Sequence, residues 1–209
     1  MNYESEIMNC STLIFLSQNG NNIEPDKKEA FRYMGCKGDS HNKELEEIYL
    51  DCLEEFRKIA SYKAVYREIP IAVYDGAVDF GFCRIENENL CKNLRGCKRA
   101  VVFAATAGLG ADRLIMKYSK ISPAEAMVCD CIASSAIEVW CDEVNEKCAG
   151  ERKTKPRFSP GYGGVSLECQ KDILAFLDAE RKLGITLNDS LMMTPVKSVT
   201  AFVGICEKE

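Results

Sequence analysis

The most unusual stretch of the sequence is Arg157–Gly164, which reads RFSPGYGG. Three glycines and one proline among these residues exclude a helix and let the backbone come close to a ligand. Arg157 offers a planar fork of donors to a carboxylate or a phosphate, and Tyr162 can stack on a ring or donate a hydrogen bond. The segment therefore predicts a ligand-binding loop, and the alternative is a surface loop without a ligand.

A second residue that could contact a ligand is Glu138, in the middle of a predicted helix within the run IASSAIEVW. Ser134 and Cys131 lie one and two turns before it, so this side of the helix carries small side chains and can admit a ligand. A carboxylate in so apolar a run needs a positive or hydrogen-bond-donating partner. The alternative is a salt bridge on the solvent-facing side.

The remaining motifs carry little chemistry. The turn Gly108–Gly110 follows a predicted buried strand and precedes a helix, but it lacks the third glycine of a dinucleotide-binding turn, which favours a plain connection. Cys129 and Cys131 fall on different faces of a helix. Cys91 and Cys97 flank a turn and could pair or bind a metal, but they lack CxxC spacing and a nearby histidine. We therefore expect no metal site.

Composition excludes several classes of function. The chain has 209 residues, 46% of them hydrophobic and 28% charged, which is typical of one globular domain. Its formal charge of −5 and the lack of a long basic run disfavour nucleic acid and anionic membranes as partners. The single histidine, His41, excludes Ser–His triads and HExxH chemistry. Without a recognisable signal peptide or membrane span, we expect a cytoplasmic protein whose twelve cysteines are mostly reduced, structural thiols.

Hydrophobic periodicity and capping residues predict a mixture of helices and strands. The clearest helix start is Ser122-Pro123-Ala124-Glu125, where serine caps and proline takes the first position. We expect helices over residues 25–34, 41–60, 86–94, 112–118, 123–147 and 167–183. We expect strands over residues 13–16, 62–74, 78–83, 99–106 and 197–205, the second of them interrupted by Pro70. Because the elements do not alternate as βαβ units, the fold class predicted is α+β.

Four runs of the sequence also resemble a known family. They are RFSPGYGG with the following LECQ, LGITLNDSLMMTPVKSVTAFVGI, CKRAVVFAATAGLGADRLI and CIASSAIEVWCDEV. Together they resemble the activation (reactivation) domain of cobalamin-dependent methionine synthase. The whole chain is similar to short stand-alone proteins of this family, found in bacteria whose methionine synthase lacks that domain. The resemblance implies an activation domain over residues 24–209, preceded by an N-terminal extension or edge strand over residues 1–23, and an antiparallel sheet packed with long helices.

The resemblance also implies a ligand and the residues that bind it. The family's domain binds S-adenosylmethionine, and its arginine five residues before the tyrosine of a Pro-Gly-Tyr turn holds the ligand's carboxylate. Arg157 and Tyr162 have that spacing, with Gly161 in the turn. The backbone at Ser159 would meet the adenine, and Glu138 would approach the amino group.

The function implied is reductive reactivation of a separate methionine synthase that lacks its own activation domain. Cobalamin would be reached only through that partner, with flavodoxin or ferredoxin as electron donor, and the protein alone would turn over nothing. Two other functions stay open. One is an S-adenosylmethionine-binding regulator or a reactivator of another corrinoid protein, and the other is an interaction subunit that binds no small ligand.

Overall fold

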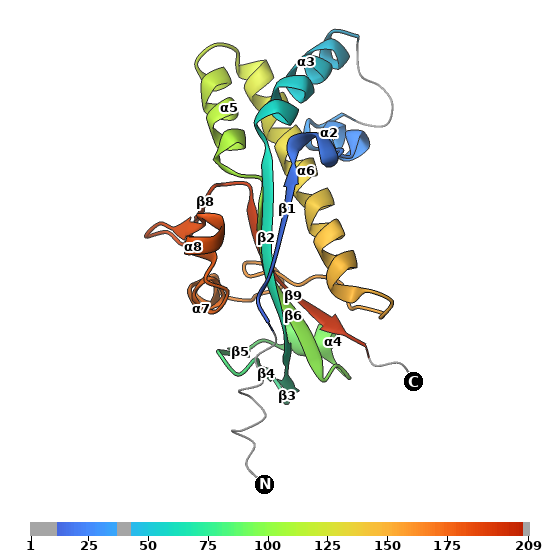
Figure 1. Cartoon of the computed structure of the whole chain (residues 1–209), viewed down its shortest axis with the longest axis vertical. Coiled ribbons are helices and arrows are strands. Elements are labelled where there is room, and N and C mark those ends of the chain that lie inside the picture. The colour runs from blue at the N-terminus through green and yellow to red at the C-terminus, as the bar shows by residue number, and fades with distance from the viewer. Residues whose placement is uncertain (1–11, 37–42, 207–209) are drawn as a thin grey trace.

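The computed structural model describes residues 12–36 and 43–206. Its centre is a four-stranded antiparallel sheet with the strand order β1-β2-β6-β9 (Figure 1). These strands are β1 (Ile14–Asn19), β2 (Ser61–Pro70), β6 (Arg99–Thr106) and β9 (Ser198–Ile205). Helices pack against both faces of this sheet, which confirms the predicted α+β class.

Strand β6 is the middle of the molecule because its side chains are buried on both faces of the sheet. Val101 and Phe103 belong to one hydrophobic core, whereas Ala100 and Val102 belong to the other. All four are fully buried. The near-continuous apolar run of this strand therefore reflects burial on both faces, as predicted. A strand that is covered on both faces has no solvent-facing positions for alternating polar residues.

The helices divide between the two faces. The first core receives side chains from α2 (Lys27–Tyr33), α3 (Lys43–Ile59), α5 (Leu109–Ser119) and α6 (Pro123–Ala149). The second core receives them from α4 (Glu88–Leu94), α7 (Cys169–Phe176) and α8 (Ala179–Leu183). The long helix α6 runs beside the sheet over much of its length (Figure 1).

Helix α6 begins as its sequence predicts. The Ser122 hydroxyl accepts a hydrogen bond of 3.4 Å from the backbone N–H of Glu125, and Pro123 takes the first helical position. The helix ends at Ala149, before Gly150, whose φ of +58° favours glycine. The helix is long enough to carry both Asp130 and Asp142, whose positions relative to each other are therefore fixed.

Two elements differ from the prediction. The helix expected over residues 167–183 is broken into α7 and α8, because Asp178 adopts a left-handed conformation with φ of 52° between them. Gly184, at φ of 72°, ends α8 as expected. The strand expected over residues 62–74 is interrupted at Pro70 as predicted, since proline cannot donate a ladder hydrogen bond, but its continuation after Pro70 belongs to a different sheet.

A small three-stranded sheet follows instead, with strands β3 (Ala72–Val73), β4 (Ala77–Asp79) and β5 (Arg84–Glu86). The strand predicted over residues 78–83 is therefore shorter than expected, and β5 was not predicted. A two-stranded pair, β7 (Thr186–Leu187) and β8 (Met193–Thr194), precedes β9, and a short 3-10 helix, η1 (Gly20–Asn22), follows β1. His41 lies outside the described residues. Among the described helices, none is long and apolar enough to cross a membrane.

Candidate functional site

The segment 153–158, which we call the arm, lies along β9 on the side away from β6. Phe158 exchanges two backbone hydrogen bonds with Phe202, each of 2.9 Å. The N–H of Lys155 donates to the carbonyl of Gly204, and the N–H of Cys206 donates to the carbonyl of Lys153, also at 2.9 Å. The arm is thus held in register beside the sheet, and it fixes the backbone on either side of Arg157.

The side chain of Arg157 reaches α6. Its Nη2 donates to Glu138 Oε2 at 2.8 Å and lies 3.1 Å from Asp142 Oδ1. The Arg157 side chain is 21% exposed, against 51% for Glu138 and 69% for Asp142. Its Nη1 is buried and has no hydrogen-bond partner among the described residues. One edge of the guanidinium is therefore neutralised by carboxylates, and the other retains a donor for a further acceptor.

Asp142 was missed by the sequence reasoning, although it stands one helical turn after Glu138. The same row of α6, at four-residue spacing, continues toward the helix start through Ser134 to Asp130. Lys197, directly before β9, places its Nζ 2.8 Å from Asp130 Oδ1 and 2.9 Å from Ser134 Oγ. A row of polar groups on α6 is thus met by one cation at each end.

The loop after the arm is a series of tight turns. The N–H of Tyr162 donates to the carbonyl of Ser159 at 3.1 Å, and the N–H of Gly161 donates to the carbonyl of Val165 at 2.8 Å. Gly161 has a φ of 83°, which explains the glycine at that position. Because the Gly161 N–H is already bonded, this residue contributes the shape of the turn rather than a free donor.

The loop is fastened to α4 from the other side. Both Asn87, the N-cap of α4, and Asn89 donate their side-chain amides to the carbonyl of Gly163 at 3.0 Å. A Cβ on Gly163 would lie 2.6 Å from the Phe158 ring, so glycine is required there by contact as well as by its φ of 57°. The Tyr162 ring makes a T-shaped contact with the buried Phe158 ring, with 5.6 Å between the ring centroids, and Tyr162 itself is 69% exposed. The loop therefore presents an accessible aromatic face on a fixed base.

The structure brings together Arg157 and Glu138, which the sequence analysis selected separately. It places Ser159, Gly161 and Tyr162 in the loop that follows Arg157. Their predicted roles as ligand contacts stay predictions.

The comparison with solved structures is decisive for the fold. The chain is similar to a structure described as "Crystal Structure of the MetH Reactivation Domain bound to AdoHcy", with a TM-score of 0.71. The alignment covers 98% of this chain and 82% of that one, at 13% sequence identity. The chain has the fold of the methionine synthase reactivation domain. No family model and no curated protein sequence matches it.

Within this reactivation-domain fold, the glycines of the Gly108–Gly110 turn allow close packing of neighbouring backbone segments. A Cβ on Gly110 would lie 2.3 Å from the carbonyl oxygen of Ile59, and one on Gly108 would lie 2.9 Å from that of Ser61. The N–H of Ala111 is bonded within the turn, to the carbonyl of Gly108. The glycines let α5 start against the end of α3, which agrees with the plain connection that the sequence favoured.

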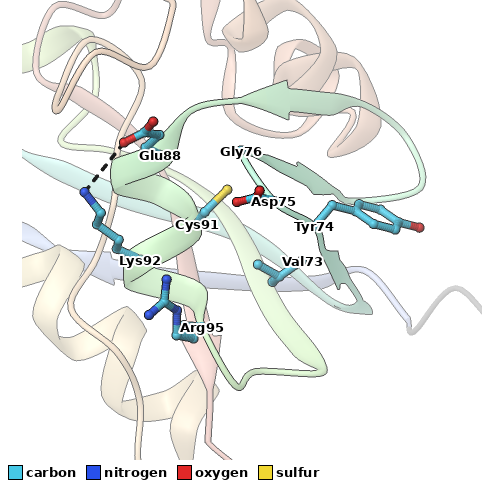
Figure 2. Close-up of a pocket in the computed structure, with 8 residues that line it drawn as sticks. All are labelled: Val73, Tyr74, Asp75, Gly76, Glu88, Cys91, Lys92 and Arg95. Carbon is cyan, nitrogen blue, oxygen red and sulfur yellow. Dashed lines mark ion pairs between the residues drawn. The ribbon is translucent and has the colours of Figure 1, made fainter.

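A separate cavity of about 210 Å³ lies between α4 and the hairpin of β3 and β4 (Figure 2). Its lining includes Asp75, Cys91 and Arg95, and an ion pair of 3.7 Å joins Glu88 to Lys92 at its rim. None of the predicted ligand residues lines this cavity. In the described part of the chain, no three Cys, His, Asp or Glu residues are grouped to hold a metal ion.

Proposed function

We propose that this protein binds S-adenosylmethionine and supports the reductive methylation of cob(II)alamin in a separate cobalamin-dependent methionine synthase. The observation that carries the proposal is the Arg157 guanidinium, which retains a buried, unpartnered Nη1 beside the carboxylates of Glu138 and Asp142. It occurs in a fold whose solved example carries AdoHcy, the demethylated form of that ligand.

The charges of this site fit the amino-acid end of S-adenosylmethionine. Arg157 supplies a planar fork for the α-carboxylate, and Glu138 and Asp142 supply acceptors for the α-ammonium. Without a ligand, Arg157 is shared by the two carboxylates, and the cluster keeps an excess negative charge. A bound zwitterion inserts between them and restores each charge contact, so binding leaves no unpaired charge behind.

The loop after the arm fits the other end of the ligand. The exposed Tyr162 ring offers a face for the adenine, and the backbone at Ser159 lies in the same turn. Two asparagine amides hold the Gly163 carbonyl, and together with the turn at Gly161 they fix the position of this loop. We assign the ligand contacts to Glu138, Arg157, Ser159, Gly161 and Tyr162, and add Asp142 to them.

The residues of this site would hold S-adenosylmethionine as the methyl donor for the partner's reduced cobalamin, with flavodoxin or ferredoxin as electron donor. Because the reduced cobalt would be the nucleophile and the neutral thioether S-adenosylhomocysteine the leaving group, this chain needs no general base or nucleophile. Its residues hold and orient the ligand and exclude water. We place the protein in the cytoplasm, acting on a synthase that lacks its own activation domain and turning over nothing alone.

The test is a reconstitution with inactive Co(II) methionine synthase from the same organism, a reductant and S-adenosylmethionine. Methylcobalamin should appear when this protein is added, and the double variant Glu138→Ala/Arg157→Ala should abolish the recovery. Arg181→Ala removes an exposed arginine of α8 and is the matched control, which should retain full recovery. If the synthase recovers equally well without the protein, the reactivation role is wrong. Ligand binding in calorimetry without any recovery would favour the regulator instead.

A further inference from the structure

Two thiols from distant parts of the chain meet at the end of the central sheet. Cys97 lies in the turn between α4 and β6, where its N–H donates to the carbonyl of Leu94 at 3.0 Å. Cys206 follows β9, and the β6–β9 register pairs Arg99 with Ile205, so both cysteines emerge at the same sheet end. The two thiols are neighbours, and Cys206 contributes to the raised pKa of Cys97.

A glycine makes room for the Cys97 thiol at this end of the sheet. A Cβ on Gly204 would lie 2.7 Å from Cys97 Sγ and 3.0 Å from Cγ of Lys155, so any side chain there would displace both. Burial, the largest influence, raises the pKa of Cys97, and the neighbouring Cys206 adds to this, whereas the ammonium of Lys155 in the arm opposes it. Cys97 is buried and Cys206 is half-buried, so Cys206 is the more accessible member of the pair.

Two other pairs of described cysteines lack this combination. Cys52 and Cys129 are also neighbours, but both are buried in the core between α3 and α6. Cys83 and Cys169 line an open cavity, yet burial raises the pKa of Cys83 to about 12 and that of Cys169 to about 11, so both are poor nucleophiles. Contact, access and a neighbouring ammonium occur together at Cys97 and Cys206.

We propose that Cys97 and Cys206 form a reversible disulfide by exchange with a low-molecular-weight disulfide such as oxidised glutathione. The Cys206 thiolate attacks one sulfur of the reagent, and one glutathione leaves as its thiol. The Cys97 thiolate then attacks the Cys206 sulfur of the mixed disulfide and releases the second glutathione. Two protein thiols are oxidised to one disulfide, and one glutathione disulfide is reduced to two thiols.

The disulfide would fasten the arm to the sheet. The N–H of Cys206 donates to the carbonyl of Lys153, and the N–H of Lys155 donates to the carbonyl of Gly204. Holding the end of β9 therefore holds the arm two residues before Arg157. The cross-link also closes a loop of about half the chain, which should raise the melting temperature by about 5–15 °C. Amide hydrogen exchange of Lys155 and Phe158 should slow as well.

The experiment treats the full chain with oxidised glutathione and maps disulfides by digestion and mass spectrometry without reduction. The expected product is a peptide pair joined through Cys97 and Cys206, which dithiothreitol reverses. In Cys97→Ser, the second step is impossible, so a glutathione adduct should accumulate on Cys206. In Cys206→Ser, Cys97 should stay reduced.

The matched control is Cys83→Ser, which removes another half-buried thiol and should leave the cross-link unchanged. If Cys97→Ser fails to fold, Cys97→Ala replaces it, and the accumulating adduct is the same readout. A wild-type protein that carries a stable glutathione adduct on Cys206 while Cys97 stays free would overturn the proposal. So would a cross-link that joins Cys206 to another cysteine. The proposal does not depend on ligand binding, and its failure leaves the proposed function unaffected.

Discussion

Glu138 Oε2 accepts a hydrogen bond of 2.8 Å from Nη2 of Arg157, which the arm beside β9 carries to the surface of α6. The pair joins a helix and an extended segment whose positions are each fixed by other contacts. Opposite charges held by separate elements are suited to a zwitterion, because the ligand can take up one contact with each. Because these residues are proposed to contact only the amino-acid end of the ligand, the contribution of that end to the binding affinity can be measured separately.

The first prediction concerns that contribution. AdoHcy should bind the wild type more tightly than 5′-methylthioadenosine, which has the adenosine part but no amino-acid end. Arg157→Ala should weaken AdoHcy binding by roughly ten- to a hundredfold, since a charge-assisted hydrogen bond contributes about 1.5–3 kcal/mol. The same variant should hardly change the affinity for 5′-methylthioadenosine. Calorimetry with both ligands measures the difference.

Arg181→Ala is the control for this measurement, because its arginine is 72% exposed on α8 and pairs with Asp178 in its own neighbourhood. It should leave both affinities unchanged. If Arg157→Ala weakens the two ligands equally, the loop has been disturbed as a whole and Arg157 does not contact the carboxylate. If it weakens neither, Arg157 is not part of the site.

The second prediction tests the loop that carries Tyr162. Gly163→Ala places a Cβ where it would lie 2.6 Å from the Phe158 ring, at a φ of 57°. We expect a loss of at least about 1 kcal/mol in the free energy of unfolding, together with weaker ligand binding, because Phe158 must move. Urea denaturation and calorimetry on the same variant give both quantities.

Gly184→Ala separates the two causes. Gly184 has a φ of 72°, but a Cβ there would meet nothing within 4 Å. This control should show the cost of backbone strain alone and leave ligand binding unchanged. Equal losses of stability and unchanged binding in both variants would mean that the Gly163 contact with Phe158 does not position the loop.

The sequence predicted most residues of the candidate site, but it did not predict the full set. Arginine before a glycine-rich loop and a carboxylate in an apolar helix each indicate a binding role by their chemistry. Asp142 could be recognised only from the direction of the Arg157 side chain, because a charged residue one turn from another is common on helix surfaces. The arm was missed because Lys155-Pro156 carries no strand signal, and its pairing with β9 depends on tertiary contacts.

The main sheet and the longest helix were predictable because buried strands and capped helices have local signatures. The break between α7 and α8 was not, because the run around Asp178 has continuous helical periodicity and good helix formers. A left-handed residue in such a run is fixed by packing of Leu177 and Ala179, both fully buried in the second core. Tertiary burial there outweighs a local preference worth only tenths of a kcal/mol per residue.

The third prediction concerns the cysteines as metal ligands. Protein purified anaerobically should contain no stoichiometric zinc or iron by elemental analysis. A metal ligand must be a thiolate, whereas burial raises the pKa of the Cys141 thiol and raises that of Cys148 to about 12. The fully reduced and metal-free protein should keep its fold. One equivalent of either metal would contradict this assignment.

The last prediction is a pH dependence of stability that originates at Glu68 on β2. Its carboxylate accepts hydrogen bonds of 2.9 Å from Nη1 and Nη2 of Arg152 and one of 2.6 Å from Nε of Arg99. The hydrogen bonds from Arg152, followed by those from Arg99, lower the pKa of Glu68, while partial burial opposes them. Arg152 also donates to the carbonyl of Cys148, so this cluster ties the end of α6 to the sheet.

Because the folded protein lowers the pKa of Glu68, the unfolded chain takes up a proton at higher pH than the folded one. The resulting stability is present above the ordinary glutamate pKa and is lost as pH falls through the folded value. Glu68→Gln should lower the free energy of unfolding by about 1–3 kcal/mol near pH 7, and the difference from wild type should narrow as pH falls below about 4. Urea denaturation across this range measures it. Glu54→Gln removes an exposed carboxylate that pairs with Lys58 on α3 and should change little at either pH. A deficit for Glu68→Gln that stays constant across the range would show that packing around the side chain, not its charge, stabilises this end of the sheet.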